Sequence, residues 1–151
     1  MQPCCIDTIV CISRMGYSNT AFFDQWSVFL DNVMLDMHDV IITSDLNFHL
    51  DIPTQLDMQP FSKTLCDRGM KQLVNEATHC KGHILDVVIV RDSTCIVPAL
   101  PNVYDSCLCN THGNSSGDHL AIRFDVNARK PSGLRRTTTF RRLWQISNTE
   151  T

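Results

Sequence analysis

The hydrophobic and polar positions along the chain predict strands that alternate with helices. Residues 7–12 alternate weakly, as a strand does, and the short apolar runs 40–43 and 85–90 have the length of buried strands. Between the first two strands, from Ala21 to Met37, apolar residues recur every three or four positions. This spacing predicts an amphipathic helix that packs its stripe against the core. The order strand, helix, strand indicates a β-α-β unit.

The stripe of this predicted helix consists of Phe22, Phe23, Trp26, Phe29, Leu30, Val33 and Met37. Further along, residues 60–66 predict a second helix, which Gly69 ends. Three short strands are expected over 71–75, 94–97 and 103–109. The last strand is predicted over 120–126, where inward positions alternate with outward ones; the inward set is Leu120, Ile122, Phe124 and Val126.

The composition fits a single globular domain. The chain has 151 residues, of which 43% are hydrophobic and 19% charged, and this length is enough to bury a core. No apolar stretch approaches the roughly 20 residues of a membrane span. The first residues, Met1 to Cys5, do not have the pattern of a signal peptide. A nuclear or cytoplasmic protein, not a secreted one, is therefore expected, with its eight cysteines reduced.

Charge is divided unevenly along the chain. Six of the 13 basic residues lie after Val126, whereas 15 of the 16 acidic residues lie before it. An acidic body does not attract a polyanion by net charge, so nucleic acid would be held through a bound metal or through the basic tail. The favoured interpretation of residues 127–151 is a solvated linker.

Polar residues gather next to three of the predicted strands. Asp45 and Asn47 follow the run 40–43, Asp86 opens the run 87–90, and Asp118 and His119 come directly before the last strand. Ligand-binding and catalytic groups gather at such positions in α/β proteins, because the strand is rigid while its loop is exposed. These residues are the candidate site.

These three motifs, an Asp-x-Asn, a Leu-Asp and an Asp-His in this order, resemble the endonuclease/exonuclease/phosphatase superfamily. Their spacing and flanks are most similar to the endonuclease domain of non-LTR (LINE-type) retrotransposons. The resemblance covers about residues 9–126, leaving 1–8 as a leader and 127–151 as a basic linker or tail. It implies an α/β fold of four layers, two packed mixed sheets flanked by helices, of which this chain would hold the C-terminal half.

The resemblance also implies a role for each residue in cleaving a DNA phosphodiester. Asp45 would orient and deprotonate the attacking water, and Asn47 would hold that water and a phosphate oxygen. Asp118 would be the carboxylate on the metal side, and His119 the donor to the phosphate. Asp86 would brace His119 and favour its protonated form. The implied metal is Mg²⁺ or Mn²⁺, which prefers hard oxygen ligands.

The sequence also departs from the family pattern. Family members begin with strands that carry an Asn and a metal-binding Glu, and nothing before Thr8 supplies either. Ser13 stands where a Tyr that contacts phosphate is usual. The chain is therefore expected to be a truncated or decayed copy, once joined to a reverse transcriptase domain, with weak or absent metal binding and no activity. Its sheet face would be exposed, which favours self-association.

Other interpretations remain open. Asp45 and Asn47 are also typical of an Asx turn, and His49 and His83 are interpreted as loop residues that form hydrogen bonds. The chain could be a phosphomonoesterase or lipid-phosphate hydrolase of the same superfamily, or a non-catalytic relic that binds nucleic acid through its tail. Short Cys/His spacings typical of zinc sites occur in His79-Cys80-x-x-His83 and Cys107-x-Cys109-x-x-His112.

Overall fold

The computed structural model describes residues 6–13, 19–52, 58–108, 111 and 117–128. Over these residues the chain forms two helices, a four-stranded sheet and a two-stranded sheet, so the predicted α/β class is confirmed. The leader up to residue 5, Arg14 to Gly16 and the tail from residue 129 lie outside the described residues.

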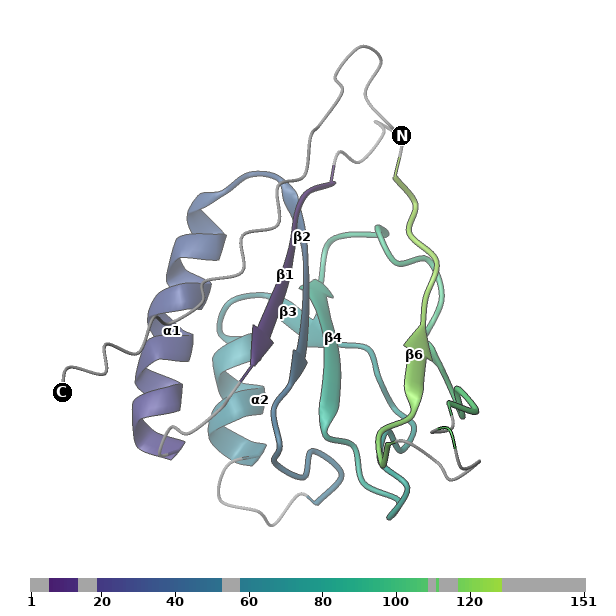
Figure 1. The fold of residues 1–151 in the computed structure, drawn as a ribbon. Coiled ribbons are helices and arrows are strands. Elements are labelled where there is room, and N and C mark those ends of the chain that lie inside the picture. The colour runs from purple at the N-terminus through teal and green to yellow at the C-terminus, as the bar shows by residue number, and fades with distance from the viewer. Residues whose placement is uncertain (1–5, 14–18, 53–57, 109–110, 112–116, 129–151) are drawn as a thin grey trace, which may run out of the picture.

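The four-stranded sheet is mixed. Its order is β1 (Ile6–Ser13), β2 (Asp39–Asp45), β4 (Asp86–Arg91) and β3 (Met70–Gln72). β1 runs parallel to β2, and α1 (Asn19–Leu35) connects them, which confirms the predicted β-α-β unit. β4 runs antiparallel to both of its neighbours (Figure 1). The C-terminal end of β2 and the N-terminal end of β4 consequently lie side by side, where the strands of the sheet end.

The helices cover one face of this sheet (Figure 1). The stripe of α1 buries Phe22, Trp26 and Leu30, and α2 (Met58–Cys66) adds further apolar side chains to the same core. Aromatic rings stack in this layer, with Trp26 lying 5.9 Å from Phe22 and 5.9 Å from Phe61 between ring centroids. The face therefore has a continuous core that large side chains fill.

Two predictions about where the helices end have different outcomes. Gly69 follows α2 with a φ of +59°, and its N–H donates to the carbonyl of Cys66, as expected of a residue that ends a helix. Met37 was predicted to belong to the stripe of α1, and this prediction is wrong. The helix ends at Leu35, so Met37 lies in the following loop with 96% of its surface exposed.

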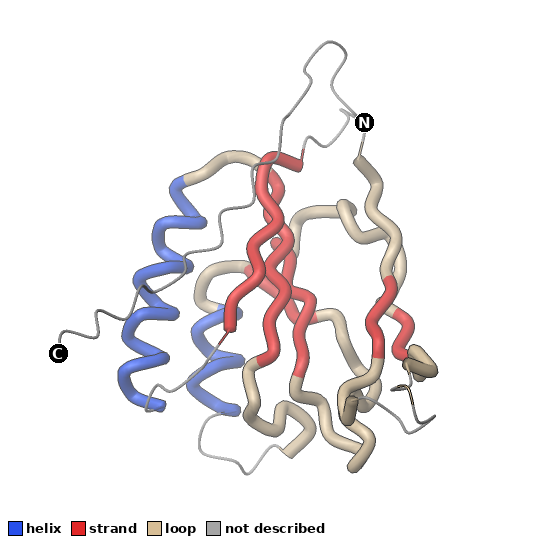
Figure 2. The backbone as a smooth tube through the Cα atoms, in the orientation of Figure 1, coloured by secondary structure: helices blue, strands red, loops and turns tan. Residues whose placement is uncertain are grey.

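A small second sheet covers the other face. Its strands, β5 (Asn102–Tyr104) and β6 (Ala121–Arg123), pair antiparallel, and β6 lies on the side of the large sheet opposite to the helices (Figure 2). Under it, side chains of β2 and β4 are buried together with Ile96. The described residues thus form three layers: helices, sheet and sheet.

The elements of this layer are shorter than predicted. β6 has three residues, and Val126, expected to point inward, is 37% exposed. No strand forms over 94–97, because local bonds compete with strand pairing there. Thr94 N–H donates to the carbonyl of Arg91, and the Thr94 hydroxyl accepts from the N–H of Ile96.

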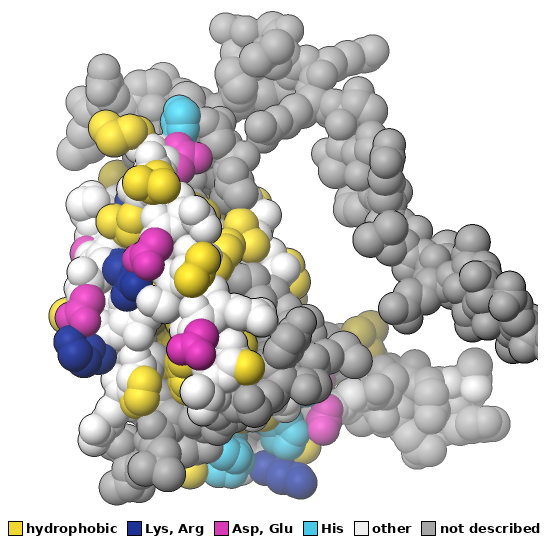
Figure 3. Space-filling model, turned by 90° about the vertical axis from the view of Figure 1, so that its left-hand side faces the viewer, with side chains coloured by type: hydrophobic (Ala, Val, Ile, Leu, Met, Phe, Trp, Pro, Cys, Tyr) yellow, Lys and Arg dark blue, Asp and Glu magenta, His cyan; other side chains and the backbone are white. Residues whose placement is uncertain are grey.

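Apolar exposure is not where the sequence placed it. A broadly exposed sheet face was expected, but Ile41 and Val88 are fully buried in the described structure, and β1 at the sheet's edge is the part that opens to solvent, with Ile9 62% exposed. Exposed apolar side chains also occur on α1, where Val28 and Leu35 contribute. On the side of the molecule that α1 covers, Figure 3 shows hydrophobic side chains scattered among acidic and basic ones. No described helix has the length and apolar character that a membrane span requires.

Candidate functional site

The register between β2 and β4 sets two carboxylates directly opposite each other. Asp45 ends β2, Asp86 begins β4, and the two are partners in the antiparallel pair. Since side chains alternate between the faces of a strand, both lie on the face that carries Ile41 and Val88. This is the face covered by the small sheet. Like charges in opposite positions repel each other, so a group that compensates charge would stabilise the pair.

His119 supplies that compensation. Its Nδ1 lies 2.9 Å from Oδ2 of Asp86, and its Nε2 lies 4.0 Å from Oδ2 of Asp45. The hydrogen bond to Asp86 raises the pKa of His119 above its ordinary value; partial burial opposes this shift, while the charges of Asp86, Asp45 and Asp118 support it. The expectation that Asp86 lies within hydrogen-bond reach of His119 is confirmed. The imidazole therefore lies partly exposed between two carboxylates, which favour its protonated form.

The loop before β4 holds His119 in place, although sequence reasoning did not identify it as part of the site. Backbone bonds join Leu120 N–H to the carbonyl of Thr78 and Cys80 N–H to the carbonyl of Asp118. They form an isolated bridge between His79 and His119. Asp118 and His119 therefore precede a strand of the second sheet and approach Asp45 from it. The five candidate residues were expected to converge at one edge of a single sheet; His119 does reach Asp45 and Asp86 where β2 and β4 meet, but from a segment outside the four-stranded sheet.

Thr78 is the centre of this loop. Its side chain is fully buried, and its hydroxyl accepts from the backbone N–H groups of Leu85 and Asp86, at 3.0 and 3.1 Å. The same residue accepts a backbone bond from Leu120. Thr78 thus connects the start of β4 with the segment that carries His119. A lone threonine in a polar loop has no motif that could have revealed this role.

Asn47 is held by Asp45. Its backbone N–H donates to Oδ1 of Asp45 at 3.1 Å, and its side-chain Nδ2 donates to Oδ2 at 3.3 Å. Asn47 has a φ of +53°, a left-handed conformation that asparagine tolerates better than most residues. The Asx-turn interpretation of this pair is therefore confirmed. The turn fixes the orientation of the Asp45 carboxylate and brings Asn47 beside it.

Asp118 points to a different partner from the other carboxylates. Its Oδ2 lies 3.2 Å from Nε2 of the nearly buried His79, and this bond lowers the pKa of the Asp118 carboxyl. The rings of His79 and His119 meet edge to face, with centroids 5.3 Å apart. Asp118 therefore borders His119, and His79 joins the site as a residue that the sequence had suggested only as a zinc ligand.

A cavity of about 410 Å³ opens beside the carboxylates. It lies on the face between the two sheets, and its lining is mostly apolar, with Asp45 and Asp86 supplying the charge. The lining residues are Cys11, Thr43, Ser44, Asp45, Asp86, Val87, Val88, Ile122 and Phe124. A ligand in this cavity would therefore meet the carboxylates and an apolar surface together.

Two groups around His119 have ligand atoms close enough to hold a metal ion. One consists of Asp45, Asp86 and His119, and the other of His79, Asp118 and His119. Within the described part of the chain, no such group includes Cys80, so the spacing His79-Cys80-x-x-His83 does not form the zinc site that it suggested. Cys109 and His112 of the second zinc motif lie outside the described residues.

Comparison with known proteins adds no family to this geometry: no family model matches the sequence, and no curated protein matches it.

Proposed function

We propose that the site at the ends of β2 and β4 belongs to a metal-dependent phosphodiesterase of the endonuclease type, with DNA as its substrate, and that its activity on DNA in this chain is at or near background. The observation that carries the proposal is the raised pKa and position of His119, between the opposed carboxylates Asp45 and Asp86. A phosphodiester needs a base for water and a donor to its oxygens. The choice of DNA rests on the resemblance of the three motifs.

His119 is suited to donate to a phosphate oxygen. Asp86 fixes its Nδ1 and leaves Nε2 toward Asp45. The hydrogen bond to Asp86 raises the pKa of the ring, which favours the protonated form that would place a positive charge where a phosphoryl group gains negative charge. In this arrangement Asp86 is a positioning residue, because it acts through the imidazole.

Asp45 is suited to accept a proton from water. Each of its oxygens accepts one hydrogen bond from Asn47 and has a second lone pair that can accept from a water. The Asx turn would keep the amide of Asn47 next to the base, where its other N–H could donate to that water or to a phosphate oxygen.

The ligand atoms fit a hard divalent cation only in part. Asp45 and Asp86 offer carboxylate oxygens, which suit Mg²⁺ or Mn²⁺, but Asp86 already pairs with His119 and Asp118 with His79. When bound, such an ion would polarise the phosphate and neutralise charge. Because so few free oxygens remain, weak binding and near-background nicking of plasmid DNA are expected.

An activated substrate tests the proposal despite this low activity. Bis(p-nitrophenyl) phosphate needs no protonation of its leaving group, so we expect slow hydrolysis in Mn²⁺ that is lost in Asp45→Ala and in His119→Ala. The monoester p-nitrophenyl phosphate tests the competing interpretation, a phosphomonoesterase of the same superfamily. If the site is a phosphodiesterase, the monoester should react more slowly than the diester. His38→Ala is the matched control, since His38 is an exposed histidine paired with Asp36 beyond the opposite end of β2.

Absence of diester hydrolysis in the folded wild-type protein would overturn the proposal, as would hydrolysis that survives both substitutions. Robust plasmid nicking that both substitutions abolish would support the site and contradict the low activity. Preference for the monoester would favour the phosphomonoesterase instead.

A further inference from the structure

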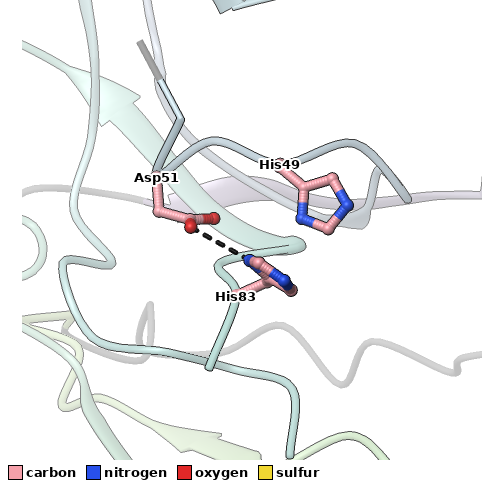
Figure 4. A group of neighbouring side chains, drawn as sticks. All are labelled: His49, Asp51 and His83. Atoms are coloured by element: carbon pink, nitrogen blue, oxygen red, sulfur yellow. Dashed lines mark hydrogen bonds and ion pairs between the residues drawn. The ribbon is translucent and has the colours of Figure 1, made fainter. Parts of the chain in front are cut away.

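A second cluster of histidine and carboxylate side chains lies outside the site described above. It consists of His49 and Asp51, in the loop after β2, and His83, in the loop before β4. Figure 4 shows the three side chains pointing toward one another. Nδ1 of His83 lies 3.1 Å from Oδ2 of Asp51, and the two imidazole centroids are 4.0 Å apart. One ligand atom from each residue lies within 4.8 Å of the other two.

The backbone beneath this cluster is fixed on both sides. Leu50, between His49 and Asp51, is buried in the helix-covered core, and its N–H donates to the carbonyl of Ile84. The N–H of Ile84 in turn donates to Oδ1 of Asp51 at 2.9 Å. The carbonyl of His83 accepts from the N–H groups of Thr78 and His79. The three side chains are therefore presented by loops that are joined to each other.

One nitrogen atom of the cluster takes no part in the ion pair between Asp51 and His83. Nδ1 of His49 is buried and has no hydrogen-bond partner. A buried polar nitrogen without a partner costs free energy, and such groups are rare in folded proteins. A ligand that accepts an electron pair from this ring would remove that cost.

We propose that His49, Asp51 and His83 bind a divalent transition metal ion, with Zn²⁺ as the ion of choice. Two imidazoles and one carboxylate form a set that suits zinc and its neighbours, whereas Mg²⁺ and Ca²⁺ prefer oxygen. Tetrahedral zinc with bonds of about 2.0–2.1 Å requires ligand atoms about 3.3 Å apart, so small side-chain rotations suffice. Three protein ligands leave one position for water or another ligand.

Metal titration of the full chain, stripped with EDTA and kept reduced, tests this site. Zn²⁺ affinity is measured by competition with a chromophoric chelator, and Co²⁺ then reports the ligand type. We expect binding at this site that excess Mg²⁺ does not displace, without the near-ultraviolet band of thiolate bound to Co²⁺. That band matters because the chain has eight cysteines, several of them free and exposed.

Substitutions locate the ion. His49→Ala and His83→Ala should each weaken Zn²⁺ affinity by more than about 10-fold. Loss of a residue that only hydrogen-bonds to a metal ligand already costs about that much, and these two residues are proposed as ligands. His38→Ala, at an exposed histidine outside the three groups of described residues that could hold a metal ion, should leave it within about twofold. In the wild-type protein, NMR signals of the His49 and His83 rings should shift on Zn²⁺ addition, a readout that needs no variant to fold.

Unchanged affinity in a folded His49→Ala, a thiolate band, unshifted His49 signals, or no Zn²⁺ binding at all would each overturn the proposal. These outcomes are separate from those of the diester assay, because His49→Ala should lose the zinc and keep the hydrolysis.

Discussion

The two faces of the four-stranded sheet differ in how they are built. Among the described residues, the helix face has a core of thirteen buried residues, including four aromatic side chains, whereas five buried residues form the core under β5 and β6. The first face is covered by helices of 17 and nine residues and the second by strands of three. The candidate site lies on the second face. Stability is therefore expected to come mainly from one side of the sheet and the chemistry from the other.

The largest effect should follow from a cavity on the helix face. Trp26 is 2% exposed and packs against rings of α1 and α2. Trp26→Ala should lower the free energy of unfolding by about 3–5 kcal/mol, which is a large part of the about 5–15 kcal/mol of an ordinary domain. Urea denaturation followed by circular dichroism measures this loss.

The matched control lies on the other face. Ile122 of β6 is only partly buried against the smaller core. Ile122→Ala should therefore lower the free energy of unfolding by less than about 2 kcal/mol, which is the smallest loss typical of a fully buried isoleucine. Equal losses at Trp26 and Ile122 would contradict the comparison between the faces.

An intermediate effect is expected at Thr78. Thr78→Val keeps the shape but removes the hydroxyl that accepts from Leu85 and Asp86. Leaving buried donors without a partner should cost about 1–3 kcal/mol. The change should also disturb His119, since the carbonyl of Thr78 accepts from the N–H of Leu120, the residue after His119. Denaturation and the NMR titration of His119 measure the two effects, and a variant that loses stability while the pKa of His119 stays unchanged would show that the loop does not position the site.

The smallest effect on stability concerns protonation of His119. Its pKa is raised in the folded state, so the stabilisation is complete below the ordinary histidine pKa of about 6.5 and is lost as pH rises through the folded-state value. Stability should therefore fall with rising pH across that window. In Asp86→Asn the pKa of His119 should decrease and the slope of stability with pH should flatten.

NMR titration of His119 in both proteins measures the pKa directly. A His119 pKa in Asp86→Asn equal to that of the wild type would mean that Asp86 is not the main cause.

Local patterns were sufficient to predict most of the helix face. The spacing of Phe22, Trp26 and Leu30 is enough to place α1, and the apolar runs place β2 and β4. Each of these signals lies within one segment and reflects burial on one side of it. The ends were less predictable, because Met37 continues the pattern after the chain has left the helix.

The site was predictable only in part. The positions of Asp45 and Asp86 at strand ends follow from sequence, and their pairing with His119 was expected from the resemblance. The bond from Asp118 to His79 depends on a backbone bridge between distant segments. The convergence of His49, Asp51 and His83 depends on bonds between two loops. No periodicity within one segment carries information of that kind.

The chain order of the site has a consequence for biosynthesis. The ribosome synthesises β2 and β4, with Asp45 and Asp86, before the segment with His119. Synthesis adds about 5–20 residues per second, and domains begin to fold while it continues. Until His119 emerges, the two carboxylates face each other without the imidazole. This end of the nascent sheet should therefore fray, and arrival of the segment with His119 and β6 should complete the pairing with Asp45 and Asp86.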